Sequence, residues 1–239
     1  MKAVILAGGK GTRLYPYTTV FPKPLVPIDD KPIIEILLRQ LKAHGITSVV
    51  ISVGHLAELI MAFLGNGEKI GIPIEYVCED EPLGTVAPLA MIEDLPDNFF
   101  LMNGDILTNL NFKDLFDFHV KNQCPLSIAT YQKEVKVDLG VMITDKVGRI
   151  VDYIEKPAYT YSVSMGVYVF NKAVIQYIPR NEYYDFPTLV KSLLSKKVKV
   201  MSYKFDDIWL DIGRPADYDE AQRIFESMRH KLLPDGNNQ

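Results

Sequence analysis

Short apolar runs separated by glycine, proline and polar turns recur through the first half of the chain. The run from Lys2 to Leu6 is rich in β-branched residues and predicts a buried strand. Further strands are predicted over residues 47–53, 74–78 and 99–102, and helices over residues 32–44, 56–64 and within 83–95. Strands that alternate with helices indicate right-handed βαβ units and a parallel sheet. The pattern therefore predicts an α/β fold.

The pattern changes after Pro125, where the predicted strands become shorter. Strands are predicted over residues 126–131, 139–143, 150–154, 164–170 and 199–203, and helices over residues 172–178, 186–195 and 215–230. The stretch from Pro24 to Pro32 is too rich in proline for a helix and predicts an extended segment. Because no linker divides the chain, we expect one domain over residues 1–232, with parts at about 1–124 and 125–232, and a disordered tail over 233–239.

Composition and charge narrow the classes of function. A chain of 239 residues that is 48% hydrophobic and 23% charged is ordinary for a globular protein with one sizeable core. The net charge of −4 and the isoelectric point near 5.6 argue against nucleic-acid binding. Cys78 and Cys124 are far apart and fit no CxxC pattern, which favours a reduced cytosol. With no signal-like start and no long apolar run, we expect a cytoplasmic protein that binds neither membrane nor nucleic acid.

A glycine-rich segment directly follows the first predicted strand and contains Gly8, Gly9 and Gly11. Glycine permits positive φ and lets another group approach the backbone without a Cβ in the way. Successive N–H groups in such a turn can converge on an anion. Cations at three positions add positive charge nearby: Lys10, Arg13 and Lys23. The segment is therefore a candidate site for a polyphosphate, although a glycine-rich turn alone is also compatible with a purely structural turn.

Two familiar phosphate-binding loops are excluded by spacing. A P-loop requires a glycine, four residues and then Gly-Lys-Ser/Thr, which this chain does not contain. The dinucleotide-binding fingerprint requires glycine at its sixth position, and counting from Gly9 places Leu14 there. A phosphate site on this loop therefore belongs to another class.

Three polar segments are predicted at the carboxyl ends of strands. They are the glycine-rich segment, Glu79, and the triplet Asn103-Gly104-Asp105. In open α/β sheets, ligands bind outside the carboxyl ends of the strands. We therefore expect these three segments to meet in one site.

Two aspartates in similar settings are candidate metal ligands. Asp105 follows an apolar strand and a glycine, and Asp211 lies between apolar residues in the segment 209–213, which ends in glycine. Each could instead cap a turn. Two such carboxylates beside a polyphosphate would form a hard-oxygen site for Mg²⁺, which takes one or two carboxylates and completes its shell with water and substrate phosphates.

Residues 6–16 and 22–25 resemble the opening signature of the sugar nucleotidyltransferases, Leu-Ala-Gly-Gly-x-Gly-Thr-Arg-Leu-x-Pro followed by Pro-Lys-Pro, at every position. The resemblance runs from Lys2 to about Tyr218 and is to compact members, such as sugar-1-phosphate guanylyltransferases. It implies a Rossmann-like mixed, mainly parallel sheet flanked by helices, with a sugar-binding lobe after the nucleotide-binding part. The implied reaction is attack of a sugar-1-phosphate oxygen on the α-phosphorus of a nucleoside triphosphate, with pyrophosphate leaving.

The resemblance also implies a role for individual residues. The implied nucleotide-binding residues are Leu6, Ala7, Gly8, Gly9, Gly11, Thr12, Arg13, Lys23, Glu79, Pro82, Gly84, Thr85, Asn103, Gly104 and Asp105. The implied catalytic set is Arg13 on the β- and γ-phosphates, Lys23 on the α-phosphate and leaving group, Lys156 on the sugar phosphate, and Asp105 and Asp211 as ligands of Mg²⁺.

The sugar side of the implied site lies in the second half of the chain. The triplet Glu155-Lys156-Pro157 would present the glutamate to sugar hydroxyls and the lysine to the sugar phosphate. The same pair could instead be a surface ion pair. Gly140, Gly166 and Tyr168 fall in the remaining sugar-pocket segments, although Tyr168 could equally be a core residue.

The segment from Glu79 to Thr85 falls where the resembled family reads the base. A carboxylate can accept hydrogen bonds from both N1–H and the N2 amino group of guanine, whereas thymine and uracil suit an amide better. An acidic solvated loop is the alternative interpretation. The continuation Val86-Ala87-Pro88 departs from the family's commoner Ala-Gly, so the base stays open.

The first hypothesis is a GTP-dependent enzyme acting on mannose or heptose 1-phosphate. The alternatives are transfer from dTTP, UTP or CTP to glucose 1-phosphate, and a non-catalytic nucleotide-sugar sensor. A sensor would be expected to lose an aspartate or a lysine, whereas this chain keeps Lys23, Asp105, Lys156 and Asp211. A homo-oligomer is compatible with the sequence.

Overall fold

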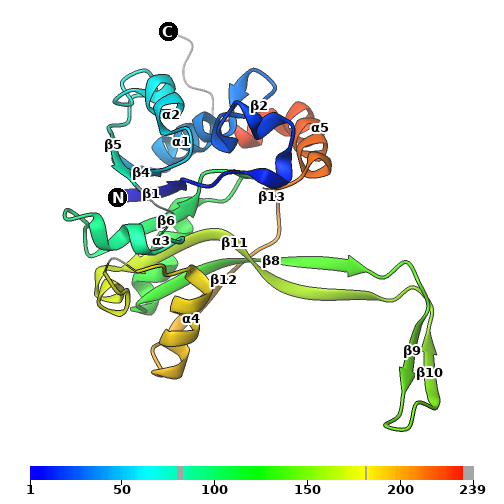
Figure 1. Ribbon diagram of the computed structural model, residues 1–239. Coiled ribbons are helices and arrows are strands. Elements are labelled where there is room, and N and C mark those ends of the chain that lie inside the picture. The colour runs from blue at the N-terminus through cyan, green and yellow to red at the C-terminus, as the bar shows by residue number, and fades with distance from the viewer. Residues whose placement is uncertain (80–82, 181, 234–239) are drawn as a thin grey trace.

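A seven-stranded mixed sheet forms the centre of the protein, in the order β12-β8-β11-β6-β1-β4-β5 (Figure 1). The structure, a computed structural model, describes residues 1–79, 83–180 and 182–233. The strands of this sheet are β1 Lys2–Ala7, β4 Ser48–Val53, β5 Ile74–Cys78, β6 Asn98–Asn103, β8 Leu126–Lys136, β11 Ala158–Asn171 and β12 Val200–Phe205. Four neighbouring pairs are parallel, and only β11 runs antiparallel to its neighbours β6 and β8. The predicted mixed, mainly parallel sheet is confirmed.

Helices and short 3-10 turns surround the sheet. The helices are α1 Ile33–Ala43, α2 Ala57–Leu64, α3 Phe112–Asn122, α4 Phe186–Ser195 and α5 Pro215–Leu232. The 3-10 turns are η1 Thr12–Leu14, η2 Tyr17–Thr19, η3 Lys23–Leu25, η4 Ala87–Met91 and η5 Lys172–Tyr177. Three short strand pairs complete the fold: β2 Pro27–Ile28 with β3 Lys31–Pro32, β7 Ile106–Thr108 with β13 Trp209–Asp211, and β9 Val141–Thr144 with β10 Ile150–Ile154.

Alternate side chains of β1 enter two separate cores, as the two-residue period of a strand requires. Ile5 packs with α1, α2 and α3 on one face, and Val4 packs with η4, η5 and α4 on the other. A third cluster joins α5 to α1 and β2. Both faces are covered, which agrees with the unbroken apolar run of β1 from Ala3 to Ala7.

Several predicted elements agree with the structure and others do not. The strands 74–78 and 150–154 and the helix 186–195 have the predicted bounds. The helices predicted within 83–95 and over 172–178 are wrong, because each segment forms only a 3-10 turn. The extended segment predicted over 24–32 is instead a 3-10 turn and a short hairpin. Helix α3, begun by the Asn111 side chain that accepts from two backbone N–H groups, was not predicted.

The two halves of the chain share the central sheet. Strands β8, β11 and β12 of the second half extend the sheet that the first half begins, and β13 returns to pair with β7. The tail over 233–239 was expected to be disordered. Its first residue, Leu233, donates its N–H to the Arg229 carbonyl and packs on the third core. Residues 234–239 lie outside the described residues. Among the described helices, none has the length and hydropathy needed to cross a membrane.

Strands β8 and β11 continue past the sheet as a two-stranded ribbon that points away from the rest of the protein (Figure 1). Seven successive pairs, from Ser164 opposite Thr130 to Ala158 opposite Lys136, hold the ribbon together. At about 3.3 Å per residue, it extends roughly 20 Å. The β9–β10 hairpin forms its far end (Figure 1). We call residues 131–163 the arm.

A buried histidine on α3 lies in a polar cluster beside the first residues of β6 and β8. His119 is 1% exposed, with Nδ1 3.0 Å from Ser127 Oγ and Nε2 3.2 Å from Asn98 Oδ1. Since an amide oxygen only accepts hydrogen bonds, the neutral ring with its proton on Nε2 fits this cluster. Burial lowers the pKa of His119 from 6.5 to about 4.

We predict that His119 makes the fold sensitive to acid. The unfolded chain takes up a proton near pH 6.5, whereas the folded chain does so only near pH 4, so stability falls as the pH drops through this window. The loss by pH 4.5 amounts to about 2.5 kcal/mol, since one pKa unit corresponds to about 1.4 kcal/mol. Urea unfolding at pH 7 and pH 4.5 measures the free energy of unfolding of the wild type and of His119→Gln. We expect the variant to lack the fall in stability that comes from His119. His230→Gln, at an exposed position, is the control. Parallel pH profiles for wild type and His119→Gln would contradict the assignment.

Candidate active site

A cavity of about 280 Å³ opens at the carboxyl ends of β1 and β6. These strands are parallel neighbours that pair Leu6 with Asn103, so the segments that follow them leave the sheet side by side. The lining residues are Leu6, Ala7, Gly8, Gly9, Gly11, Thr12, Arg13, Lys23, Pro24, Thr85, Asn103, Asp105 and Gly213. The structure thus brings most of the expected nucleotide-binding residues into one cavity.

The glycine-rich segment is closely packed at two of its three glycines. Gly11 has φ +62°, and a Cβ there would lie 3.0 Å from the Thr18 side chain and 3.1 Å from that of Lys23. A Cβ on Gly8 would lie 3.2 Å from Glu79 Oε1. At Gly9 a Cβ would meet no atom within 4 Å, and Gly9 lines the cavity. The loop is therefore held from behind by glycine contacts, with space left on the cavity side.

Lys23 connects the glycine-rich segment to two carboxylates. Its ammonium is largely buried, donates a hydrogen bond to Asp105 Oδ2, and lies 4.0 Å from Asp211 Oδ1. The 3-10 turn η3, which begins after Pro22, positions this side chain. Lys23, Asp105 and Asp211 form what we call the charge cluster.

Pairing of β7 with β13 brings the two aspartates together from positions 106 residues apart. Asp211 pairs with Ile106 in this ladder, and the N–H of Ile212 donates to the Asp105 carbonyl at 3.3 Å. Burial raises the pKa of the Asp211 carboxyl, and the negative charge of Asp105 raises it further. Lys23 and Arg13 oppose both effects. Arg13 reaches this side of the cavity, since a Cβ on Gly213 would lie 3.6 Å from its guanidinium.

The charge cluster fits a divalent cation that is shared with a phosphate ligand. Asp105 Oδ1 is buried and has no hydrogen-bond partner among the described residues. An unpartnered carboxylate oxygen beside a second carboxylate is a suitable pair of ligands for Mg²⁺. No group of three or more histidine, cysteine, aspartate or glutamate side chains forms a metal cage within residues 1–79, 83–180 and 182–233. A cation held here would therefore complete its shell with water and phosphate oxygens.

Several expected site residues support the cavity rather than line it. Gly104 lets its backbone approach β1, because a Cβ there would lie 3.1 Å from the Leu6 carbonyl oxygen. Gly84 and Gly166 have positive φ, and added Cβ atoms would clash at 2.7 Å with Tyr184 O and Asn103 Nδ2 respectively. These glycines permit close packing around the cavity.

Tyr168 is a core residue. It is 6% exposed, and its ring stacks on Phe186 at a centroid distance of 3.8 Å. Its hydroxyl accepts a hydrogen bond from Ser164 Oγ at 3.1 Å, and burial raises its pKa. Of the two alternatives for Tyr168, the structure favours a core residue, because the ring faces the core beneath α4.

Both carboxylate oxygens of Glu79 have partners within the protein. Oε1 accepts from Ser52 Oγ at 2.5 Å, and Oε2 accepts from the N–H of Leu83 at 3.3 Å. Glu79 lies directly behind Gly8 and is not among the cavity-lining residues. Its role in reading a base stays a prediction. Pro82, the other expected base-side residue here, lies outside the described residues.

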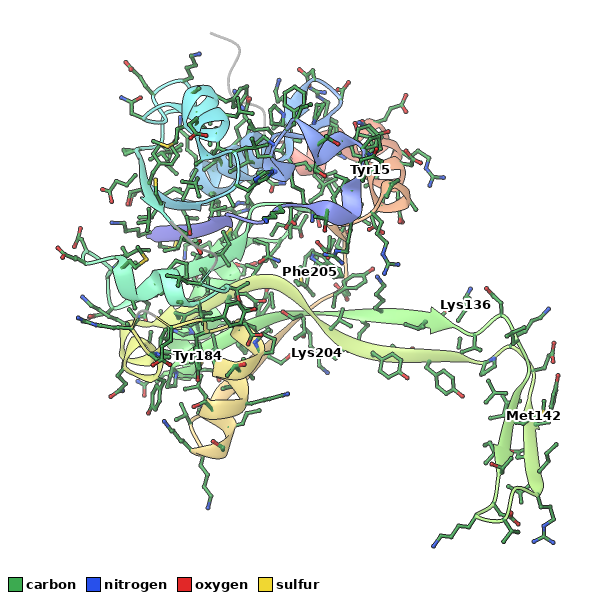
Figure 2. The ribbon with its side chains drawn as sticks, viewed as in Figure 1. Tyr15, Lys136, Met142, Tyr184, Lys204 and Phe205 are labelled. Carbon is green, nitrogen blue, oxygen red and sulfur yellow. The ribbon has the colours of Figure 1, made fainter. Side chains whose placement is uncertain are left out.

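The structure does not bring the expected sugar-binding residues of the arm to the cavity. Glu155 accepts a hydrogen bond from Tyr153 Oη at 2.6 Å, and the Tyr153 ring lies against Gly140. Lys156 follows in a turn with φ +43° between β10 and β11. All of these positions lie beyond Lys136, near the hairpin that carries Met142, well away from the sheet (Figures 1 and 2). The β8–β11 ribbon carries these sugar-side residues away from the sheet in this structure. Their role in binding the sugar phosphate stays a prediction.

Three further residues help to build the cavity without having been predicted. Pro24 and Gly213 line it, and Gly54 packs behind the loop, where an added Cβ would lie 3.1 Å from the Gly8 carbonyl oxygen. Gly54 directly follows β4, so a glycine at the carboxyl end of a predicted strand was the available signal.

Comparisons of the whole sequence with known proteins identify the family that the chain matches. The sequence model of the nucleotidyl transferase family matches residues 2–227. The chain is 35% identical to a UTP–glucose-1-phosphate uridylyltransferase of Synechocystis sp., over 93% of this chain and 63% of that protein. It is 33% identical to a probable mannose-1-phosphate guanylyltransferase of Oryza sativa subsp. japonica, over 97% of this chain and 66% of that protein. The chain thus spans about two thirds of the length of these curated relatives.

The fold also matches solved structures. HddC from Yersinia pseudotuberculosis superposes with a TM-score of 0.73 at 27% identity, covering 94% of this chain and 99% of that one. A second crystal structure of HddC, complexed with GMP-PN, gives a TM-score of 0.71 at 26% identity.

Proposed function

Because the chain belongs to the nucleotidyl transferase family, we propose that it transfers a nucleoside monophosphate from a nucleoside triphosphate to a sugar 1-phosphate and releases pyrophosphate. The observation that carries this proposal is the charge cluster at the mouth of the glycine-lined cavity. One ammonium and two carboxylates beside this cavity support the binding of a polyphosphate together with a divalent cation. Relatives named for uridylyl and guanylyl transfer to sugar 1-phosphates support the same reaction.

The glycine-rich segment and two cations would hold the triphosphate. Gly9 lines the cavity with open space beside its Cα, and backbone N–H groups of such a loop can donate to phosphate oxygens. Arg13 would bind the β- and γ-phosphates from the rim of the cavity. Lys23 would neutralise the α-phosphate and the leaving pyrophosphate. Positioning and charge neutralisation are the main contributions that a protein makes to phosphoryl transfer.

Asp105 and Asp211 would hold the divalent cation, which we propose to be Mg²⁺. When bound, this ion supplies neutralisation of the charge that develops on the reacting phosphates. The nucleophile is an oxygen of the sugar phosphate and is already an anion, so no side chain is needed to remove a proton from it. The new bond joins this oxygen to the α-phosphorus, and the bond to the β-phosphate oxygen breaks. Lys156 would hold the sugar phosphate in line for this attack.

We propose GTP with mannose or heptose 1-phosphate as substrates, with UTP and glucose 1-phosphate as the alternative. Guanylyltransferases among the relatives and the GMP-PN complex of HddC favour the guanine nucleotide. The uridylyltransferase at 35% identity is the observation that favours the alternative. Cys78 and Cys124 are both free, and a reduced cytosol stays our proposal for the compartment.

Pyrophosphate release tests the proposed reaction directly. With Mg²⁺, four triphosphates and a panel of sugar 1-phosphates, we expect the fastest release from GTP paired with mannose or heptose 1-phosphate. Asp105→Asn removes one ligand charge from the cluster and should slow release by at least about 100-fold, since several kcal/mol of charge stabilisation are lost. Asp117→Asn, which loses only an exposed pair with Lys113, should leave the rate unchanged. No release by the wild type from any pair would refute the proposed function.

Replacing Glu79 by glutamine tests how the base is read. If its carboxylate binds guanine, kcat/KM for GTP should fall at least about tenfold relative to that for UTP, because charged hydrogen bonds contribute about 1.5–3 kcal/mol. The measurement compares both triphosphates at a fixed sugar phosphate, with Glu58→Gln on α2 as the control. An equal fall for both triphosphates would instead mean that Glu79 only supports the loop through Ser52 and Leu83.

A further inference from the structure

The arm carries an unusual share of the exposed apolar surface. Of 22 large hydrophobic side chains that are exposed in the described part of the chain, ten lie in the arm, each at least 40% exposed. They are Val135, Leu139, Met142, Ile143, Val147, Ile150, Val151, Tyr153, Tyr159 and Tyr161. A two-stranded ribbon on its own is marginally stable, and an apolar surface of this extent indicates a binding partner. The arm is therefore a surface that another group covers.

The arm is held away from its own chain. Seven uninterrupted pairs join β11 to β8 between Ser164 and Ala158, and a register shift between Ser164 and Tyr168 separates this ribbon from the pairing within the sheet. Figure 2 shows the side chains of the ribbon and the hairpin standing free of the rest of the protein. In this conformation the chain does not cover its own arm.

A second exposed apolar segment lies in the sequence between residues that line the cavity, Arg13 and Lys23. Tyr15, Tyr17, Val20 and Phe21 are 72%, 45%, 64% and 55% exposed, and they lie between the glycine-rich segment and Lys23. We call this the rim surface. The chain therefore carries two exposed apolar surfaces, one on the arm and one in the segment between Arg13 and Lys23.

The residues of the proposed site are divided in the same way. The cavity holds the expected triphosphate-binding residues, whereas Glu155 and Lys156 lie where the ribbon meets the β9–β10 hairpin, between β10 and β11. An arm that covers the rim surface of another copy would deliver its Lys156 to the cavity of that copy. This single arrangement would cover both apolar surfaces and complete the site.

We propose that two copies of this chain exchange arms, so that each active site combines the cavity of one copy with Glu155 and Lys156 of the partner subunit. The proposal rests on the proposed function for the role of these two residues. In a two-fold dimer, arm meets rim surface twice, which closes the assembly. The ten apolar side chains of one arm offer on the order of 1,000 Å² of surface, compared with about 800 Å² per partner in a standard interface.

The charge of the arm favours a second copy as its occupant. Residues 131–163 contain five lysine or arginine and five aspartate or glutamate side chains, so the arm is neutral although the whole chain carries −4. A neutral apolar arm can approach the acidic body of another copy without long-range repulsion. An arm that recruited a polyanion or a strongly charged protein would be expected to carry a net charge.

The mass of the protein in solution tests the exchange without reference to activity. Sedimentation of the wild type should give twice the chain mass of 27.1 kDa. A variant with residues 137–157 replaced by Asn-Gly, which joins the paired positions 136 and 158 by a two-residue turn, should sediment as a folded monomer. A monomeric wild type, or a dimer that survives removal of the hairpin, would overturn the proposal.

Complementation between two inactive variants tests the shared site. Lys156→Ala and Asp105→Asn carry different affinity tags and are coexpressed, and the mixed dimer is purified through both tags. Each variant alone should lose at least about tenfold in kcat/KM. In the mixed dimer one site joins an intact cavity to an intact arm, so about half of the wild-type activity should return. A mixed dimer as inactive as its parents would overturn the exchange.

A matched control separates rescue from general effects of mixing. The mixed dimer of Asp105→Asn with Asp211→Asn has both changes in the cavity cluster, so it should stay inactive. If the wild type itself releases no pyrophosphate, the proposed function fails, and the sedimentation result alone then decides whether arms are exchanged.

Discussion

The buried ammonium of Lys23 between Asp105 and Asp211 is the interaction on which this structure depends. Two carboxylates brought this close would repel each other. Burial, and then the negative charge of Asp105, raise the pKa of Asp211, and the Lys23 ammonium opposes both effects. The β7–β13 ladder, which closes the second half of the chain onto the first, is what brings them together. The close glycine contacts behind the loop place the proposed phosphate site against the same cluster. The strand pairing, the glycine contacts and the charge cluster thus all meet at the carboxyl ends of β1 and β6.

The sequence was most informative where the signals were local. Three glycines after a β-branched strand, and polar residues after the next parallel strand, correctly predicted one cavity at the carboxyl ends of β1 and β6. Helix α3 was not predicted, and its start depends on the Asn111 side chain, which accepts from two backbone N–H groups. Tyr168 could be assigned to the core only once its contact with Phe186 was known.

The arm shows why the rest of the site could not be predicted. The strands expected over 126–131 and 164–170 extend past a register shift between Ser164 and Tyr168 into a ribbon, and pairing between residues distant in sequence, such as Ser164 with Thr130, sets the direction of that ribbon. Local periodicity contains no information about that direction. The consequence is functional, since the residues expected to bind the sugar phosphate lie on a projecting element. Exchange of arms would make the second substrate's site a property of a pair of chains.

The most direct measurement of the central claim is Mn²⁺ binding followed by electron paramagnetic resonance, with and without GTP. Because Lys23 neutralises part of the carboxylate charge, the cluster alone should bind the cation weakly. A bound triphosphate adds oxygen ligands and negative charge, so Mn²⁺ affinity should rise at least about tenfold with GTP and should not rise in Asp105→Asn. Equal Mn²⁺ affinity with and without GTP, or an unchanged rise in Asp105→Asn, would contradict the account.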